Sequence, residues 1–198
     1  MGQSDVNLAA LIGSRICHDL ISPIGAINNG LELLEMSGGR DGPEIELISE
    51  SVDNASGRIR FFRIAYGPAS DQPMGRSEVV SILKDNMSGG RLDVAYGPLD
   101  PQPRWAIRLA FLAVQCIETA LPYGGRIEIN CDNGSWALTG YAAKISFDTD
   151  LWGLLAGAPA NDLAPAHVQF ALLPRVAEDA GSQIAVTHSE HEFVRIRL

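Results

Sequence analysis

Cysteine is scarce in this sequence of 198 residues, and basic residues are fewer than acidic ones. The three cysteines, Cys17, Cys116 and Cys131, are odd in number and far apart, which favours buried free thiols over disulfides or a cysteine metal site. Lysine and arginine total 15 against 24 acidic residues, giving a net charge of -9. Because binding to a phosphate backbone needs clustered positive charge, no direct contact with nucleic acid is expected, and the partners should be proteins.

Long uncharged apolar runs are also missing. No segment approaches the ~18 to 20 residues that a membrane-spanning helix needs. The first residues lack the basic-then-apolar layout of a signal peptide. We therefore expect a cytoplasmic protein with no membrane partner. Hydrophobic residues make up 46% of the chain, which is enough for one large domain or two small ones.

The first third of the chain has the pattern of a helical hairpin. Apolar residues recur every three or four positions over residues 8–34, and a strict heptad repeat follows over residues 45–66. The glycines and the proline of residues 37–43 predict a turn between them. Two helices supply half of a four-helix bundle, which a second copy would complete by two-fold symmetry. The pattern predicts a homodimer.

Turn-forming residues between positions 66 and 75 predict a boundary between two domains, residues 1–70 and residues 75–198. The first is the helical hairpin. The second mixes helices with strands that we expect to be antiparallel, which predicts an α+β fold with a two-layer sandwich. The expected helices are 77–87, 103–121 and 163–180, and the expected strands are 91–96, 126–131, 136–147, 182–187 and 193–198.

His18 is the clearest candidate for a reactive side chain in the first helix. It lies two positions from Ile16 and from Leu20, about 200° around a helix from each, so it is expected on an exposed face. A neutral imidazole is nucleophilic near neutral pH and can carry a phosphoryl group. Pro23 should loosen or bend the helix just beyond it. The alternative is an ordinary solvated or core histidine.

The run from His18 to Ile27, HDLISPIGAI, resembles the H-box of sensor histidine kinases. The resemblance implies that His18 is phosphorylated and that Asp19 orients or accepts the proton of the other ring nitrogen, although Asp19 could be a solvated helix acid. Arg15 could steady a phosphoryl oxygen or pair with acidic groups of a partner, or be an ordinary surface arginine. The expected docking surface for a partner consists of Ser14, Arg15, Ile21, Ser22, Gly25 and Asn29, although Ile21 could instead pack in the bundle.

The second domain resembles the ATP-binding catalytic domain of the same kinases, but its nucleotide motifs are altered. Residues 111–130 resemble the kinase N-box, with Cys116 in place of the asparagine that holds Mg²⁺, and a thiol is a poor magnesium ligand. Residues 147–153 contain one glycine where the kinases have two, and residues 163–170 have none where a glycine-rich loop should cover the phosphates. We expect no ATP and no metal bound by this chain, with Mg²⁺ supplied by a partner receiver domain.

A kinase-like hairpin joined to a domain without nucleotide motifs resembles the ChpT-type histidine phosphotransferases of alphaproteobacteria. Residues 18–27 and 168–184 are the most specific parts of this resemblance. It implies an enzyme that accepts a phosphoryl group from the receiver domain of a hybrid histidine kinase. The group would pass through His18 to response regulators of the CtrA type, which control the cell cycle. Two alternatives remain: an adaptor that binds receivers or kinases without chemistry, and, less favoured, an ATP-dependent histidine kinase.

Overall fold

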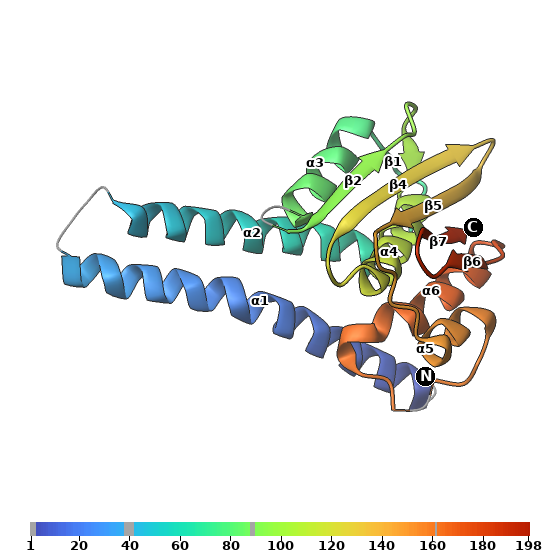
Figure 1. Ribbon diagram of the computed structural model, residues 1–198, viewed down its shortest axis with the longest axis horizontal. Coiled ribbons are helices and arrows are strands. Elements are labelled where there is room, and N and C mark those ends of the chain that lie inside the picture. The colour runs from blue at the N-terminus through green and yellow to red at the C-terminus, as the bar shows by residue number, and fades with distance from the viewer. Residues whose placement is uncertain (1–2, 38–41, 88–89, 161) are drawn as a thin grey trace.

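Two long helices form an arm that extends from a body containing a β-sheet (Figure 1). Helix α1 spans Gln3–Ser37 and helix α2 spans Pro43–Ala65. Pro43 begins α2, where the N–H that proline lacks would have no helical partner. This computed structural model describes the whole chain except residues 1–2, 38–41, 88–89 and 161. Most of the turn expected at residues 37–43 therefore lies outside the described residues.

Helix α1 is continuous through Pro23, so the proline does not end it. The two helices approach each other closely at Gly30, where a Cβ atom would lie 2.6 Å from Cγ1 of Ile48. Glycine permits this approach because it has no side chain. Among the described helices, none has the length and apolar character needed to cross a membrane.

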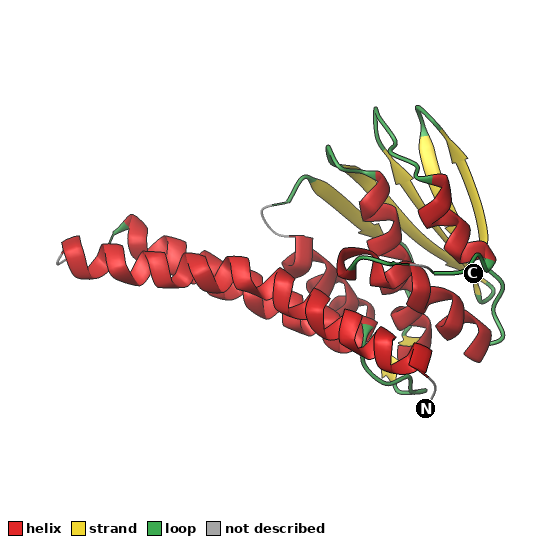
Figure 2. Cartoon of the chain, turned by 90° about the horizontal axis from the view of Figure 1, so that it is seen from below, coloured by secondary structure: helices red, strands yellow, loops and turns green. Residues whose placement is uncertain are grey.

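The body has two layers, with helices gathered on one side of a five-stranded sheet (Figure 2). Its main helices are α3 (Arg76–Met87), α4 (Arg104–Ala120) and α6 (Val168–Asp179). The sheet order is β2-β4-β5-β7-β6. These strands are β2 (Leu92–Tyr96), β4 (Gly125–Asp132), β5 (Ser135–Tyr141), β6 (Ala185–Ser189) and β7 (Phe193–Arg197). The α+β sandwich expected from the sequence is confirmed.

Several short elements connect this framework. A two-stranded sheet pairs β1 (Pro73–Met74) with β3 (Gln102–Pro103). Helix α5 (Thr149–Gly153) and the 3-10 turns η1 (Leu154–Ala156) and η2 (Pro165–His167) lie between β5 and α6.

Two expectations about the strands were wrong. Strands β2 and β4 pair in parallel, because α4 carries the chain across the sheet between them and the second strand returns in the same direction. The strand expected over residues 136–147 ends at Tyr141. Beyond it the chain turns into α5, which Asp148 caps by accepting hydrogen bonds from the backbone of Asp150 and Leu151.

The hairpin and the body share one hydrophobic core. The last turns of α2 enter it with Phe61, Phe62 and Ile64, and the ring of Phe61 stacks on that of Phe111 in α4 with centroids 4.5 Å apart. Helix α4 is buried along most of its length between the sheet, α2 and α6. The arm is thus fixed to the body by packing, and this places the first half of α1 beside α6 and η2.

Candidate functional site

The imidazole of His18 projects from α1 into solvent, with 81% of its side chain exposed. Its Nδ1 lies 3.1 Å from Oδ1 of Asp19, the next residue. Because an ionised carboxylate can only accept, this contact favours, for the neutral imidazole, the tautomer with its proton on Nδ1. The lone pair of Nε2 is then directed to solvent, as nucleophilic attack requires.

Asp19 is held between several partners. Only 11% of its side chain is exposed. Its second oxygen, Oδ2, accepts a hydrogen bond from Nε of Arg15 at 2.6 Å and lies 4.0 Å from Nη1 of Arg58 in α2. The carboxylate therefore presents one oxygen to the imidazole and the other to two guanidinium groups. This arrangement differs from that of a solvated helix acid.

The guanidinium of Arg15 makes its hydrogen bonds to other groups of the same chain. Its side chain is 16% exposed, and it donates a second hydrogen bond, through Nη1, to the backbone carbonyl of Ala166 in η2. The guanidinium thus joins the histidine helix to the C-terminal domain. Arg15 belongs to the sequence-predicted docking surface, but its polar atoms face inward.

Partly buried polar groups of α4 and of the end of α2 lie close to this site. Burial raises the pKa of Glu118, an effect that the nearby charges of Arg15 and Arg58 oppose. Burial also raises the pKa of Tyr66 to about 12, and its hydroxyl donates to Oε1 of Gln115 at 3.1 Å. Sequence reasoning missed Arg58 and Glu118, because they lie in other helices and only the folding of the chain brings them near His18.

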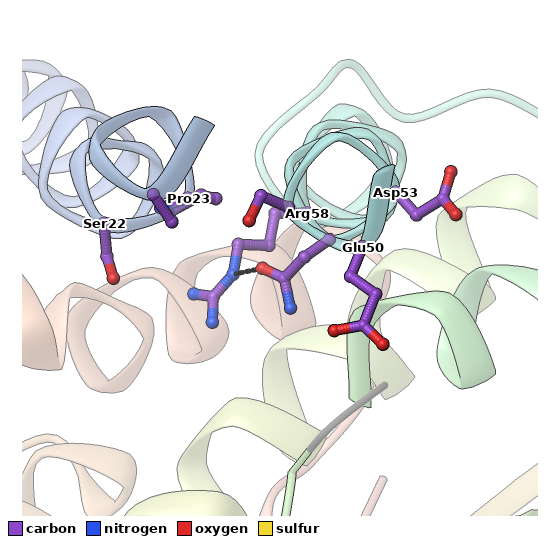
Figure 3. Close-up of a pocket in the computed structure, with 8 residues that line it drawn as sticks. Ser22, Pro23, Glu50, Asp53 and Arg58 are labelled. Carbon is purple, nitrogen blue, oxygen red and sulfur yellow. Dashed lines mark hydrogen bonds between the residues drawn. The ribbon is translucent and has the colours of Figure 1, made fainter. Parts of the chain in front are cut away.

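A groove of about 480 Å³ follows His18 along the hairpin. It is lined by Ser22, Pro23 and Ala26 of α1 and by Glu50, Ser51, Asp53, Asn54 and Arg58 of α2. Figure 3 shows Ser22 and Arg58 pointing to the same side of the two helices, with Glu50 beside them. Arg58 is fixed there because its Nε donates to Oδ1 of Asn54 at 2.8 Å.

The other residues of the expected docking surface are accessible. Ser14, Ile21 and Asn29 are exposed, with 68% of Ile21 accessible in the single chain. Gly25 is half-buried, and a Cβ at this position would meet nothing within 4 Å. The surface around His18 is therefore open, with the small residues Ser14 and Gly25 and one large apolar side chain, Ile21.

The segments whose sequences resemble altered kinase nucleotide motifs contribute buried apolar side chains to the body. Cys116 has no exposed surface, and burial raises the pKa of its thiol. Trp152 stacks on Phe147 with ring centroids 4.9 Å apart and meets the ring of Phe170 edge-on. Within the described residues, no group of three or more His, Cys, Asp or Glu side chains is arranged to hold a metal ion.

Comparison with known proteins shows that this chain is similar to phosphotransferases. A family model described as the histidine phosphotransferase C-terminal domain matches residues 76–192. Protein phosphotransferase ChpT of Brucella abortus (strain 2308) is 31% identical over 199 residues, covering 96% of this chain and 95% of the relative. A bacterial phosphotransferase solved at 1.7 Å has a TM-score of 0.82 and 30% identity, with 100% of this chain and 98% of the other covered.

The chain belongs to the family of ChpT-type histidine phosphotransferases. Its activity is therefore protein phosphotransfer in a phosphorelay. The expectation of a phosphotransferase is confirmed.

Proposed function

We propose that His18 carries the phosphoryl group, accepting it from the receiver domain of a hybrid histidine kinase and passing it to the receiver aspartate of a response regulator. The observation that carries this proposal is the 81% exposed imidazole whose Nδ1 contacts Asp19. The family resemblance implies response regulators of the CtrA type as acceptors, and the cytoplasm as the place of transfer.

In the first transfer, the lone pair of Nε2 attacks the phosphorus of the donor's aspartyl phosphate. A P–N bond forms, the P–O bond to the donor breaks, and its carboxylate leaves. Positive charge that builds on the ring is stabilised by Asp19, which keeps its hydrogen bond to the Nδ1 proton. In the second transfer, the acceptor's aspartate attacks the phosphorus, a P–O bond forms and the P–N bond breaks, and the imidazole leaves in its neutral form.

We infer that the receiver docks on the open surface around His18. Ser22 and Gly25 lie one and two turns after the histidine, so their small side chains permit close approach of a partner. Ser14, Ile21 and Asn29 extend this surface, and the groove beyond Ser22 has an acidic rim at Glu50 and Asp53. A receiver surface with apolar and basic side chains would complement it.

We propose that a second copy of the chain covers the remaining apolar face of the hairpin. Five large apolar side chains at heptad spacing are 41% to 50% exposed in the single chain: Ile24, Leu31, Ile45, Val52 and Ile59. We name them the apolar strip. Such side chains in two long helices favour a four-helix bundle formed by two copies.

The chain itself is proposed to bind neither ATP nor a metal, with Mg²⁺ supplied by the receiver. The buried Cys116 and the aromatic packing of Phe147, Trp152 and Phe170 support this proposal, because they leave apolar side chains where the kinase motifs would place polar ones.

A transfer assay tests the role of His18. A receiver carrying radiolabelled phosphate is mixed with the wild type, with His18→Ala and with His191→Ala, whose histidine lies in the exposed turn between β6 and β7. Label should reach the wild type and His191→Ala and be absent from His18→Ala. Label retained by His18→Ala would exclude His18 as the carrier.

The same variants separate the alternatives. A binding adaptor without chemistry predicts that His18→Ala supports signalling as well as the wild type does. An ATP-dependent kinase predicts that labelled ATP with Mg²⁺ phosphorylates the wild type in the absence of any receiver. Either result would contradict the proposed relay.

A further inference from the structure

One side chain connects the C-terminal domain to the proposed phosphorylation site. We propose that Arg15 is a positioning residue: it joins the carbonyl of Ala166 to the carboxylate of Asp19 and thereby holds the His18 imidazole in its reactive tautomer and orientation. The inference rests on the proposed role of His18. It gives the domain without nucleotide motifs a structural task in phosphotransfer.

The geometry of Arg15 suits this task. Its Nε donates to Oδ2 of Asp19 at 2.6 Å, and its Nη1 donates to the carbonyl of Ala166. A guanidinium can hold two acceptors at once because its N–H donors point in fixed directions within one plane. With 16% of its side chain exposed, Arg15 offers little surface to an incoming receiver.

The carbonyl of Ala166 is held in a fixed position by the backbone around it. The turn η2 has proline at its first position, which fixes the backbone, and the N–H of His167 donates to the carbonyl of Ala164 at 2.9 Å. The following helix, α6, is anchored by Val168 and Phe170, neither of which is exposed. Movement of this carbonyl would therefore disturb the core of the body.

Arg58 supplies a second, weaker restraint. Its Nη1 lies 4.0 Å from the same oxygen of Asp19, beyond hydrogen-bonding distance. Without Arg15, the carboxylate would be free to rotate toward Arg58 and leave Nδ1 of His18 without its acceptor. The ring proton could then move to Nε2, the nitrogen that must attack phosphorus.

Single-turnover transfer from a labelled receiver tests the proposal. In Arg15→Gln, the rate at saturating receiver should fall about tenfold to a hundredfold, the scale of misplaced reacting groups, while the half-saturating receiver concentration stays unchanged. Arg126→Gln is the matched control, because Arg126 pairs with Glu128 on an exposed part of the sheet. An unchanged saturating rate combined with a higher half-saturating concentration would mean that Arg15 contacts the receiver, and would overturn the proposal.

Arg15→Lys separates charge from geometry. Lysine keeps the positive charge, but its single terminal nitrogen cannot reproduce the fork between Asp19 and Ala166. We expect its saturating rate to fall as well. Recovery of the wild-type rate in Arg15→Lys would show that charge alone is sufficient and would refute the positioning role.

Nitrogen NMR of the His18 ring gives a readout that a loss of stability would not mimic. The wild type should show the proton on Nδ1, and folded Arg15→Gln should show a shift toward the proton on Nε2. Identical ring spectra would refute the proposal. Failure of the proposed function itself is distinguishable, because then either the wild type would take no label or His18→Ala would keep it.

Discussion

At the scale of the residue, two neighbours in α1, His18 and Asp19, differ strongly in exposure. The side chain of His18 is 81% exposed, whereas that of Asp19 is 11% exposed. A carboxylate removed from water needs partners that compensate for its lost hydration. Arg15 and Arg58 supply them, so the acid beside His18 keeps a fixed orientation without blocking access to the ring.

The resemblance of residues 18–27 to the H-box was sufficient to predict the contact between His18 and Asp19, because both residues lie in that one helical segment. It could not predict the other half of the site. Arg58 and Glu118 reach it from α2 and α4, and Ala166 contributes a backbone carbonyl, for which side-chain identity gives no signal. The inward orientation of Arg15 depends on the packing of η2 against α1.

Glu118 should make stability depend on pH. Burial raises the pKa of its carboxyl in the folded protein above the ordinary value of 4.5. The folded state therefore holds this proton more tightly than the unfolded state, so its stabilising contribution is complete below 4.5 and is lost as the pH rises through the folded pKa. Glu118→Gln has no such proton to lose, and its free energy of unfolding at neutral pH should exceed that of the wild type.

Urea unfolding over a range of pH would measure this effect. The difference between Glu118→Gln and the wild type should shrink toward acid pH. Glu192→Gln, at an exposed turn, is the control and should follow the wild type throughout. Lower stability of Glu118→Gln at neutral pH would show that attraction to Arg15 and Arg58 outweighs the cost of burial.

At the scale of the element, the heptad repeat predicted α2 but not its two environments. Ile45, Val52 and Ile59 stay partly exposed along the arm, whereas Phe62 is buried in the body. Phe61 lies outside the heptad positions and is fully buried, because Phe111 of α4 stacks against it. The repeat records helical periodicity, and only tertiary contacts decide where the helix leaves the arm and enters the core.

The junction between α2 and α3 depends on Gly57. A Cβ at this position would lie 2.7 Å from backbone atoms of Asp85 in α3. We expect Gly57→Ala to lower the free energy of unfolding by about 1 to 3 kcal/mol, because the overlap outweighs the higher helix propensity of alanine.

Gly13→Ala is the matched control in the other helix of the arm. A Cβ at Gly13 meets nothing within 4 Å, so the substitution should raise the free energy of unfolding by up to about 1 kcal/mol. Denaturant unfolding measures both variants. Equal stabilisation by the two alanines would show that α2 and α3 are not closely packed at Gly57.

At the scale of the whole molecule, the arm has two surfaces with different proposed partners. One carries His18 and is proposed to bind receivers, and the other is the apolar strip, proposed to bind a second copy. Val52, in the strip, is 43% exposed. If two copies pack through this strip, Val52→Glu would bury a charge without a partner, which costs several kcal/mol.

We therefore expect the wild type to sediment as a dimer and Val52→Glu to sediment as a monomer in analytical ultracentrifugation. Leu99→Glu is the control, because Leu99 is a 79% exposed apolar residue outside the strip. A monomeric wild type would contradict the homodimer, and a dimeric Val52→Glu would place the interface elsewhere. Since His18, Asp19, Arg15 and Ala166 contact one another within a single chain, the monomeric variant should still accept label from a receiver.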